Sequence, residues 1–325
     1  MSKHAFEEKL REIEQLRSAP GPATQAKLAK ALGNRSNYLV SKAAAVVADL
    51  QLAALIPGLV AAFERFLQDA VKTDPQCWAK IAIAKALKDL GHRDPAVFLQ
   101  GIAHVQMEPV FGGRQDTAGP VRSASALALV DCQLDDFEIL SCLADLLVDA
   151  EATVRVGAAL AIAQLGSPGG ALLLRLKARV GDTEPEVTGQ CLFSLLSLGT
   201  ADAVAFVGRF LDHGDAQVRV EAATALGAAR DPEALEMLTS RYRREGDPEL
   251  RQAIVTAAGA SPVTAAADFL LGVIAAGDQN LALAAIEALA ASRFRNEFRE
   301  QTEAAVRARR VSALEQHFRQ QFKND

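Results

Sequence analysis

The sequence predicts an all-α fold in which helical hairpins stack side by side as an α-solenoid, or superhelix. Three observations lead to this prediction. At 325 residues the chain is longer than a single closed core usually grows. Half of its residues are hydrophobic but only 5% are aromatic, and the surplus is alanine and leucine, which favour helices packed through small side chains. One helical pattern also recurs about every 32 residues.

The recurring pattern is an amphipathic helix, and its first apolar residue is called the anchor below. Small or apolar residues follow each anchor after about one, two and three helical turns, which places them on one face. From the third anchor onward, successive anchors are about 31 to 33 residues apart. The anchors are Leu39, Ala79, Val121, Val154, Val187, Val218, Leu250 and Leu281.

A second set of helical segments lies between the anchored helices. These segments include "DPEALEMLTSRYRR" and "ADAVAFVGRFLDH", and several open with Asp-Pro. An aspartate caps a helix N-terminus and a proline fits its first turn, so each unit is predicted to be a helical hairpin. One hairpin cannot bury its apolar face alone, so stacking is expected to give a concave side and capped ends.

The organisation expected from this pattern has three parts. Residues 1–33 are predicted to form N-terminal capping helices. Residues 34–292 form a solenoid of about seven hairpins, and residues 293–325 form a C-terminal basic amphipathic cap helix.

An acid followed by Val-Arg and then a run such as "AATALG" resembles HEAT repeats, an armadillo-like class. The short repeats shared with phycobilisome bilin-lyase proteins are especially similar. The segments that carry the resemblance best are "DAQVRVEAATALGAARDPEAL" from Asp215 and "EATVRVGAALAIAQLGSP" from Glu151. Two units depart from the pattern, because Thr188 and Ala282 stand where the arginine is expected. The resemblance implies the fold and leaves the activity open.

A row of cations and a row of acids accompany the anchors. The cations directly follow their anchors and are Lys80, Arg122, Arg155, Arg219 and Arg251. The acids precede their anchors by three positions and are Glu151, Glu184, Asp215, Asp247 and Asp278. One interpretation is a structural ladder in which each acid pairs with an arginine of the next unit. The alternative is that the cations line the groove and bind an acidic partner, which makes Arg122 and Arg155 binding candidates.

The stretch "QMEPVFGGRQDTAG", residues 106–119, interrupts the repeat. The step from Ala79 to Val121 is about ten residues longer than the norm. Insertions in stacked repeats form loops on one edge, and such loops often carry binding residues. This stretch is therefore the leading candidate site, with an ordered insertion of no binding role as the alternative.

Within this insertion, most residues have an expected structural role. Gly112 and Gly113 permit conformations that other residues avoid, and Met107 and Phe111 are expected to pin the loop to the stack. Asp116 or Thr117 is expected to cap the following helix. The residues left without such a role, and so proposed to bind a partner, are Glu108, Arg114 and Gln115.

Trp78 is the only tryptophan in the chain and follows Cys77 at the start of an anchored helix. It either packs beneath the first turn of that helix or serves as a binding anchor. The step from Leu39 to Ala79 is also long, so "QDAVKTDPQ" is expected to form a second raised loop. The two loops and Trp78 together are hypothesised to form a partner-binding edge.

The C-terminal segment from Arg293 to Asp325 has eight lysines and arginines against five acids, a net charge of +3. Its apolar stripe is Val311, Leu314, Phe318 and Phe322. The stripe is predicted either to cover the last repeat as a cap or to dock another chain.

No pattern for catalysis, metal binding or a cofactor is present in the sequence. The four cysteines have no CxxC pair or zinc spacing and are expected to be buried reduced thiols. No nucleophile, base and orienting group stand together. The net charge of −5 disfavours nucleic acid as a partner. The charged N-terminus indicates a cytoplasmic protein, and "GSPGG" breaks the uncharged run 156–174, so no membrane span is expected.

The predicted function is a non-catalytic scaffold that binds another protein through its concave groove and the 106–119 loop. The alternative is a bilin-lyase-like or DNA-glycosylase-like HEAT enzyme. The first resemblance implies a tetrapyrrole-holding groove that acts with a second subunit. The second implies a basic groove with aromatic residues and a carboxylate. No site motif of a lyase is visible, and the negative charge with only two tyrosines disfavours a glycosylase.

Overall fold

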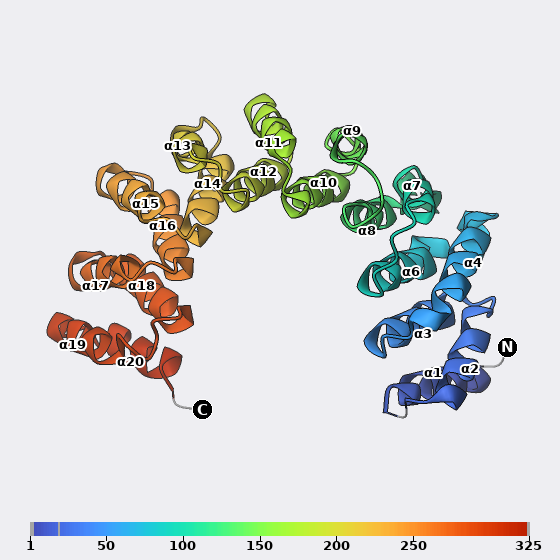
Figure 1. The fold of residues 1–325 in the computed structure, drawn as a ribbon. Helices are drawn as coiled ribbons and strands as arrows, with labels where there is room; N and C mark the ends of the chain where they lie inside the picture. The colour runs from blue at the N-terminus through green and yellow to red at the C-terminus, as the bar shows by residue number, and fades with distance from the viewer. Residues whose placement is uncertain (1–2, 19, 324–325) are drawn as a thin grey trace. The chain divides into compact units, whose positions relative to one another are not determined.

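The computed structural model describes residues 3–18 and 20–323, and the chain divides into two compact units, residues 1–170 and 171–325. Most of the described residues lie in helices that pack in sequential pairs (Figure 1), and two short strands are also present. The prediction of an all-α solenoid of helical hairpins is confirmed.

The first unit contains the helices that precede and follow the interruption of the repeat. They are α1 (Lys3–Gln15), η1 (Leu16–Ser18), α2 (Pro22–Leu32), α3 (Asn37–Asp49), η2 (Ala53–Leu55), α4 (Ile56–Leu67), α5 (Ala70–Thr73), η3 (Pro75–Cys77), α6 (Trp78–Asp89), α7 (Ala96–Ile102), α8 (Gly119–Leu129), α9 (Asp136–Leu146) and α10 (Ala152–Leu165). The strands β1 (Met107–Val110) and β2 (Gly113–Asp116) lie between α7 and α8.

Helix α11 (Pro168–Val180) contains the boundary between the units. The second unit continues with α12 (Pro185–Ser197), α13 (Ala203–Gly208), η4 (Arg209–Asp212), α14 (Ala216–Ala228), α15 (Pro232–Arg244), α16 (Pro248–Ala260), α17 (Ala265–Ala276), α18 (Gln279–Ala291), α19 (Arg299–Arg309) and α20 (Ser312–Gln321).

The anchored helices form a continuous row within each unit. Helices α3, α6, α8 and α10 pack against one another in that order in the first unit, and α12, α14, α16 and α18 do so in the second (Figure 1). All eight anchors are buried. The apolar periodicity therefore predicted both the anchored helices and the face that each one buries.

The aspartates of the predicted acid row cap their helices. Asp215 Oδ1 accepts a hydrogen bond from the backbone N–H of Gln217 at 2.7 Å. Asp247 and Asp278 cap α16 and α18 in the same way. The glutamates Glu151 and Glu184 precede α10 and α12 without a side-chain cap. The shorter carboxylate reaches the first turn, as the N-cap preference for aspartate predicts.

Close approach between anchored helices in the second unit requires glycine at one position of the repeat. A Cβ atom on Gly227 of α14 would lie 2.3 Å from the backbone oxygen of Ala257 in α16. A Cβ atom on Gly259 of α16 would lie 2.7 Å from the Cβ of Ala288 in α18. The small residues of the sequence are thus what lets successive hairpins stack.

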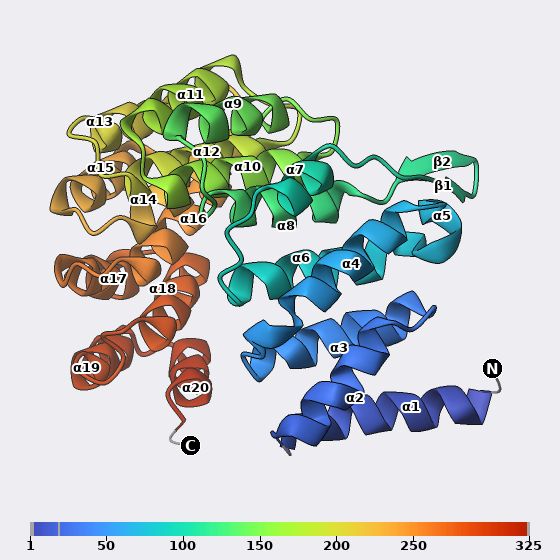
Figure 2. The same cartoon turned by 45° about the vertical axis from the view of Figure 1, so that its right-hand side comes forward.

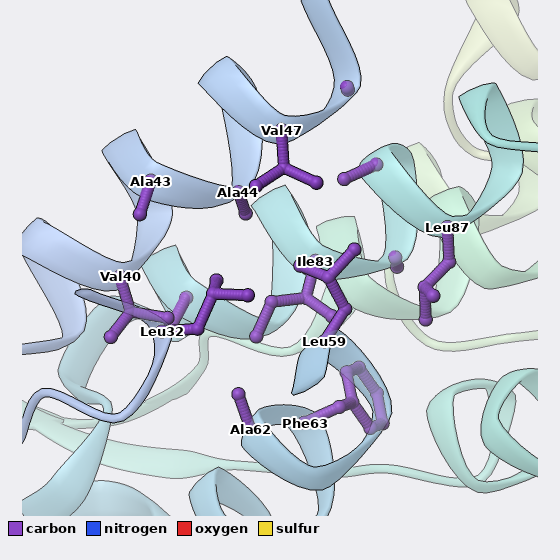
Figure 3. Close-up of a cluster of buried hydrophobic side chains, with 14 of the residues drawn as sticks. Leu32, Val40, Ala43, Ala44, Val47, Leu59, Ala62, Phe63, Ile83 and Leu87 are labelled. Carbon is purple, nitrogen blue, oxygen red and sulfur yellow. The ribbon is translucent and has the colours of Figure 1, made fainter. Parts of the chain in front are cut away.

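Part of the hydrophobic core of the first unit lies between α2, α3, α4 and α6. Figure 3 shows Leu32, Val47, Leu59, Phe63 and Ile83 pointing toward one another, and all of them are buried. Burying a side chain of this size contributes on the order of 1.5–3 kcal/mol. This core fixes α3 and α6 beside each other.

The C-terminal stripe covers the core of the second unit. Leu314, Phe318 and Phe322 are buried, and the rings of Phe318 and Phe322 stack with centroids 4.7 Å apart. The cap interpretation predicts this burial. The segment contains two helices, α19 and α20, where one was expected, because Arg310 takes a left-handed conformation (φ 53°) between them.

No helix among the described residues is both long and apolar enough to span a bilayer. The uncharged run 156–174 falls in two helices, α10 and α11, which meet at Gly166 and Ser167.

Candidate binding site

The insertion at residues 106–119 forms an antiparallel β-hairpin. Met107 pairs with Asp116 and Val110 pairs with Gly113. The two-residue turn between the strands contains Gly112 at φ 87°, a conformation that glycine adopts without strain. Figure 2 shows the hairpin standing out from the connection between α7 and α8. The sequence predicted an insertion here but not its strands.

Glu108 holds the base of this hairpin. It is only 6% exposed. Its Oε1 accepts hydrogen bonds from the Thr117 hydroxyl at 2.6 Å and from Gln106 Nε2 at 2.7 Å. The same oxygen accepts the backbone N–H of Gln76 at 2.7 Å, while Gln76 Nε2 donates to Oε2 at 3.1 Å. The expectation that Glu108 has no structural role is wrong.

The charge of Glu108 is stabilised by these donors. Burial by itself would raise the pKa of the Glu108 carboxyl, but the hydrogen bonds from Thr117, Gln106 and Gln76 outweigh it and lower the pKa. Glu108 is therefore an ionised structural residue at neutral pH, and its buried carboxylate offers no surface to a partner.

The segment that Glu108 holds is strained. Gln76 and Cys77 are consecutive residues at φ 60° and 56°, in the left-handed region. Each such residue costs on the order of 1–3 kcal/mol, and the conformation persists only because surrounding contacts fix it. The strained segment ends directly at Trp78, the first residue of α6, so the hairpin base determines where that indole lies.

A buried ion pair lies beneath the same segment. Lys80 Nζ is 2.9 Å from Asp74 Oδ2, and both side chains are fully buried. Asp74 also accepts the backbone N–H groups of Ala79 and Lys80, each at 3.0 Å. Gln106 Nε2 donates to the backbone oxygen of Asp74 at 2.9 Å. The two insertions predicted from the repeat spacing are thus joined through one polar network.

Arg122 and Arg155 also have structural partners. Arg122 makes a bidentate pair with Asp149, with Nε–Oδ2 at 2.8 Å and Nη2–Oδ1 at 2.9 Å. Its Nη1 donates to Asp116 Oδ2 at 2.7 Å. Arg155 Nη1 donates to the backbone oxygens of Asp149 and Ala150 at 2.7 and 2.9 Å. Both arginines are buried, so their proposed contact with a partner is not available in this structure.

The ladder interpretation holds for part of the cation row. Arg219 Nη2 pairs with Asp247 Oδ2 at 3.1 Å, so the acid pairs with the arginine of the preceding hairpin and not with that of the next one. Arg122 pairs across hairpins as well, but with Asp149, which lies outside the acid row. Lys80 pairs within its own hairpin. The guanidinium of Arg251 lies over the ring of Tyr242 at 4.5 Å.

The exposed part of the hairpin is its tip and second strand. Phe111 is 108% exposed, so the expectation that it pins the insertion to the stack is wrong. Arg114 and Gln115 are exposed, and Arg114 Nη2 donates to the backbone oxygen of Met107 at 2.7 Å. Asp116 accepts the backbone N–H groups of Gln106 and Ala118, which closes the hairpin before α8 begins.

The cysteines are free thiols, as expected, although only Cys77 and Cys191 are buried. Burial raises the pKa of the Cys77 and Cys132 thiols to about 11 and that of the Cys191 thiol to about 12. They are therefore protonated at neutral pH. No group of three or more His, Cys, Asp or Glu within residues 3–18 and 20–323 is arranged to hold a metal ion.

The model of the family described as HEAT repeats matches residues 172–259, which lie in the second unit. This match confirms HEAT repeats over these residues, and the helical hairpins described above agree with the resemblance to HEAT repeats. No curated protein matches the sequence.

Several solved structures are similar to this chain at low identity. Human deoxyhypusine hydroxylase in complex with glycerol is 22% identical with a TM-score of 0.31, over 76% of this chain and 87% of that one. The complex of CpcE and CpcF of phycocyanin lyase from Nostoc is 20% identical with a TM-score of 0.37, over 70% and 89%. An engineered protein is 16% identical with a TM-score of 0.34, over 100% and 97%. Similarity at this level says nothing about what this chain binds or catalyses.

Proposed function

We propose that this protein is a non-catalytic scaffold that binds another protein through the 106–119 hairpin and the adjoining face of its anchored helices. The observation that supports the proposal is that the base of the hairpin is held by hydrogen bonds whereas its tip is exposed to solvent. Glu108 fixes the base through four hydrogen bonds, while Phe111 at the tip is fully exposed.

A large aromatic side chain on a preformed hairpin suits protein recognition. Aromatic anchors supply much of the energy of protein interfaces when they enter a pocket of the partner. Because the hairpin is ordered by its own network, its ordering entropy is not lost again on binding. Arg114 and Gln115 stand beside the tip on β2 and could supply polar contacts around it.

Binding is favoured over catalysis by what the polar groups of this region already do. The carboxylates of Glu108 and Asp74 accept structural hydrogen bonds, and Cys77 is buried with a raised pKa. A general base or nucleophile needs an accessible atom of suitable pKa. These groups lack one, which supports the scaffold and leaves the lyase-like and glycosylase-like alternatives without a favouring observation.

The test uses Phe111→Ala, with Phe137→Ala as the matched control. Phe137 lies on α9 of the same unit and is 79% exposed, so both substitutions remove an exposed phenylalanine. Partners captured from native extract by the unaltered protein are identified, and their affinities are measured with each variant. We expect Phe111→Ala to weaken the affinity at least about tenfold and Phe137→Ala to leave it unchanged.

Neither variant should lower the melting temperature, because both side chains are exposed. The double variant Arg114→Ala with Gln115→Ala tests the polar contacts in the same assay. Equal affinity of Phe111→Ala and Phe137→Ala for every captured partner would contradict the role of the hairpin.

A further inference from the structure

A shallow groove of about 350 Å³ lies on the first unit, between the anchored helices α3 and α6. Tyr38 and Trp78 line one end of it, at the first turns of the two helices. Lys42 and Lys85 line it further along the same helices, and Ile81 forms part of its apolar floor. The groove is separate from the hairpin tip but adjoins the strained segment that the hairpin base holds.

The aromatic end of the groove is exposed and fixed in place. Trp78 is 49% exposed, although an indole is among the most apolar side chains. Its ring meets that of Tyr38 edge-on, with centroids 5.4 Å apart. The left-handed residues Gln76 and Cys77 precede it, and the carboxylate of Glu108 accepts the backbone N–H of Gln76. Strained backbone therefore keeps Trp78 at the surface.

At the other end of the groove, the charges of two lysines are not paired with acidic side chains of the described residues. Lys42 Nζ lies 5.2 Å from the centre of the Tyr38 ring and has no acidic partner in the described part of the chain. Lys85 is exposed and makes no ion pair or hydrogen bond with any residue of the ranges 3–18 and 20–323. No acidic side chain is among the described residues that line the groove. The groove is thus locally positive on a chain whose net charge is −5.

We propose that this groove binds an acidic peptide segment of a partner protein. An apolar side chain of the segment lies on Trp78 and Tyr38, and its carboxylates pair with Lys42 and Lys85. This inference rests on the proposed scaffold function and adds the chemical class of the partner. The charge complementarity of the groove and the absence of any acid along it carry the argument.

The helix geometry sets the spacing that the partner needs. Along α3, Lys42 stands four residues after Tyr38, which is about 6 Å of helix rise. Along α6, Lys85 stands seven residues after Trp78, about 10 Å of rise. A matching segment therefore carries its apolar side chain about 6–10 Å from its carboxylates, which is two or three residues if extended and four to seven if helical.

A single-stranded nucleic acid also combines stacking with negative charge, but the groove fits it less well. Such sites pair several aromatic rings with a cationic track along the backbone. This groove has two lysines, and the whole chain is acidic, so the surrounding field repels a polyanion. A short acidic peptide carries only the charges that the two lysines neutralise.

The test uses Trp78 as its own probe, because it is the only tryptophan of the chain. Three blocked peptides place a glutamate pair about two, four and seven residues after a single leucine, which covers the extended and helical spacings. We expect at least one to change the Trp78 emission in a saturable way, and the same peptides with lysine in place of glutamate to have no effect. A single-stranded oligonucleotide is titrated in parallel.

Two double variants are compared, and each reverses the charge of two lysines. The first pair lies inside the groove, and the second pair lies outside it as a control. Lys42→Glu with Lys85→Glu is expected to weaken peptide binding by about 10- to 100-fold, from two lost pairs and two repulsions. Lys9→Glu with Lys30→Glu makes the same change at exposed lysines of α1 and α2, which lie outside the groove and form no ion pair with any described residue, and should leave binding unchanged. Lys9, Lys30 and Lys85 are exposed and Lys42 is half-buried, so circular dichroism should show both variants folded.

Three results would overturn the inference: no response to any acidic peptide up to about 1 mM, equal binding by both charge-reversed variants, or a preference for the oligonucleotide. The scaffold function fails separately. If Phe111→Ala loses the captured partner while the groove variants bind every peptide alike, the groove inference falls and the scaffold stands. If neither Phe111→Ala nor the groove variants lose any partner, the scaffold function is contradicted.

Discussion

Replacing Glu108 with alanine tests whether the buried network holds the hairpin and the strained segment together. The substitution removes the acceptor of four hydrogen bonds. The donors left behind belong to Gln76, Gln106 and Thr117. Gln106 is buried and its Nε2 keeps only its bond to the backbone oxygen of Asp74, whereas Gln76 is exposed and can turn to water.

The free-energy cost of the substitution depends on which of these donors can find another partner. A hydrogen bond to a charged group contributes about 1.5–3 kcal/mol, and a buried donor left unpaired costs about 1–3 kcal/mol. Water recovers part of the loss at Gln76 and Thr117. Releasing Gln76 and Cys77 from the left-handed region returns part of their strain, on the order of 1–3 kcal/mol each. The balance is a destabilisation of the first unit by about 2–4 kcal/mol.

Urea unfolding followed by Trp78 fluorescence measures this value. The tryptophan lies in the first unit, two residues after Gln76, so its emission reports on the part of the chain that loses the bonds. With a slope of about 1–3 kcal/mol per molar urea, we expect the midpoint to fall by about 1–2 M. Glu108→Gln keeps one oxygen acceptor and should cost less. A midpoint within about 0.3 M of the original, with unchanged native emission, would refute the reasoning.

The pH dependence of the same variant provides a second check. The native pKa of Glu108 is lowered because the donors of the network outweigh the effect of burial. A group with a lowered native pKa stabilises the fold above its unfolded pKa, about 4.3 for glutamate, and loses this contribution as the pH falls through the native value. The difference in unfolding free energy between the original protein and Glu108→Ala should therefore have its largest value at pH 7. It should decrease as the pH falls below about 4.3 and through the native pKa of Glu108.

Three further outcomes are expected. Lys80→Ala leaves the carboxylate of Asp74 buried without its cation and should cost about 3–5 kcal/mol in urea unfolding; a loss below about 1 kcal/mol would show that the pair is dispensable. Gly227→Ala places a methyl 2.3 Å from a backbone oxygen of α16 and should lower the melting temperature, whereas Gly246→Ala, with open space around its Cβ, should not. The Cys191 thiol, buried and with a pKa of about 12, should resist alkylation at pH 8 until the chain unfolds, and fast labelling of the native protein would contradict its burial.

The sequence predicted the anchored helices because their signal is local and repeated. Val154 and Val187, like the other anchors, are buried where the periodicity placed them. Aspartates such as Asp215 cap the helices that they precede, since a capping bond joins residues only two or three positions apart. The site of the insertion was also visible, because extra residues change the spacing of a repeat whatever they fold into.

The interior of the insertion was predicted poorly. Phe111 was expected inward because it is apolar, and Glu108 outward because it is charged, and both expectations are reversed. Burial of a carboxylate depends on donors brought from elsewhere, here including Gln76, which is 32 residues away in sequence. Nothing in the local pattern around Glu108 shows that such donors will be present.

Local signals and contacts between distant segments therefore determined different features of this protein. The sequence by itself determined a stack of helical hairpins, since apolar period and helix capping act within one or two turns. Only the tertiary structure decided which polar residues are buried with partners inside the protein, such as Glu108, Arg122 and Arg155, and which remain exposed at the surface, such as Arg114 and Lys85. A side chain's partner is set by contacts between segments far apart in the chain, and those contacts exist only once the hairpins have stacked.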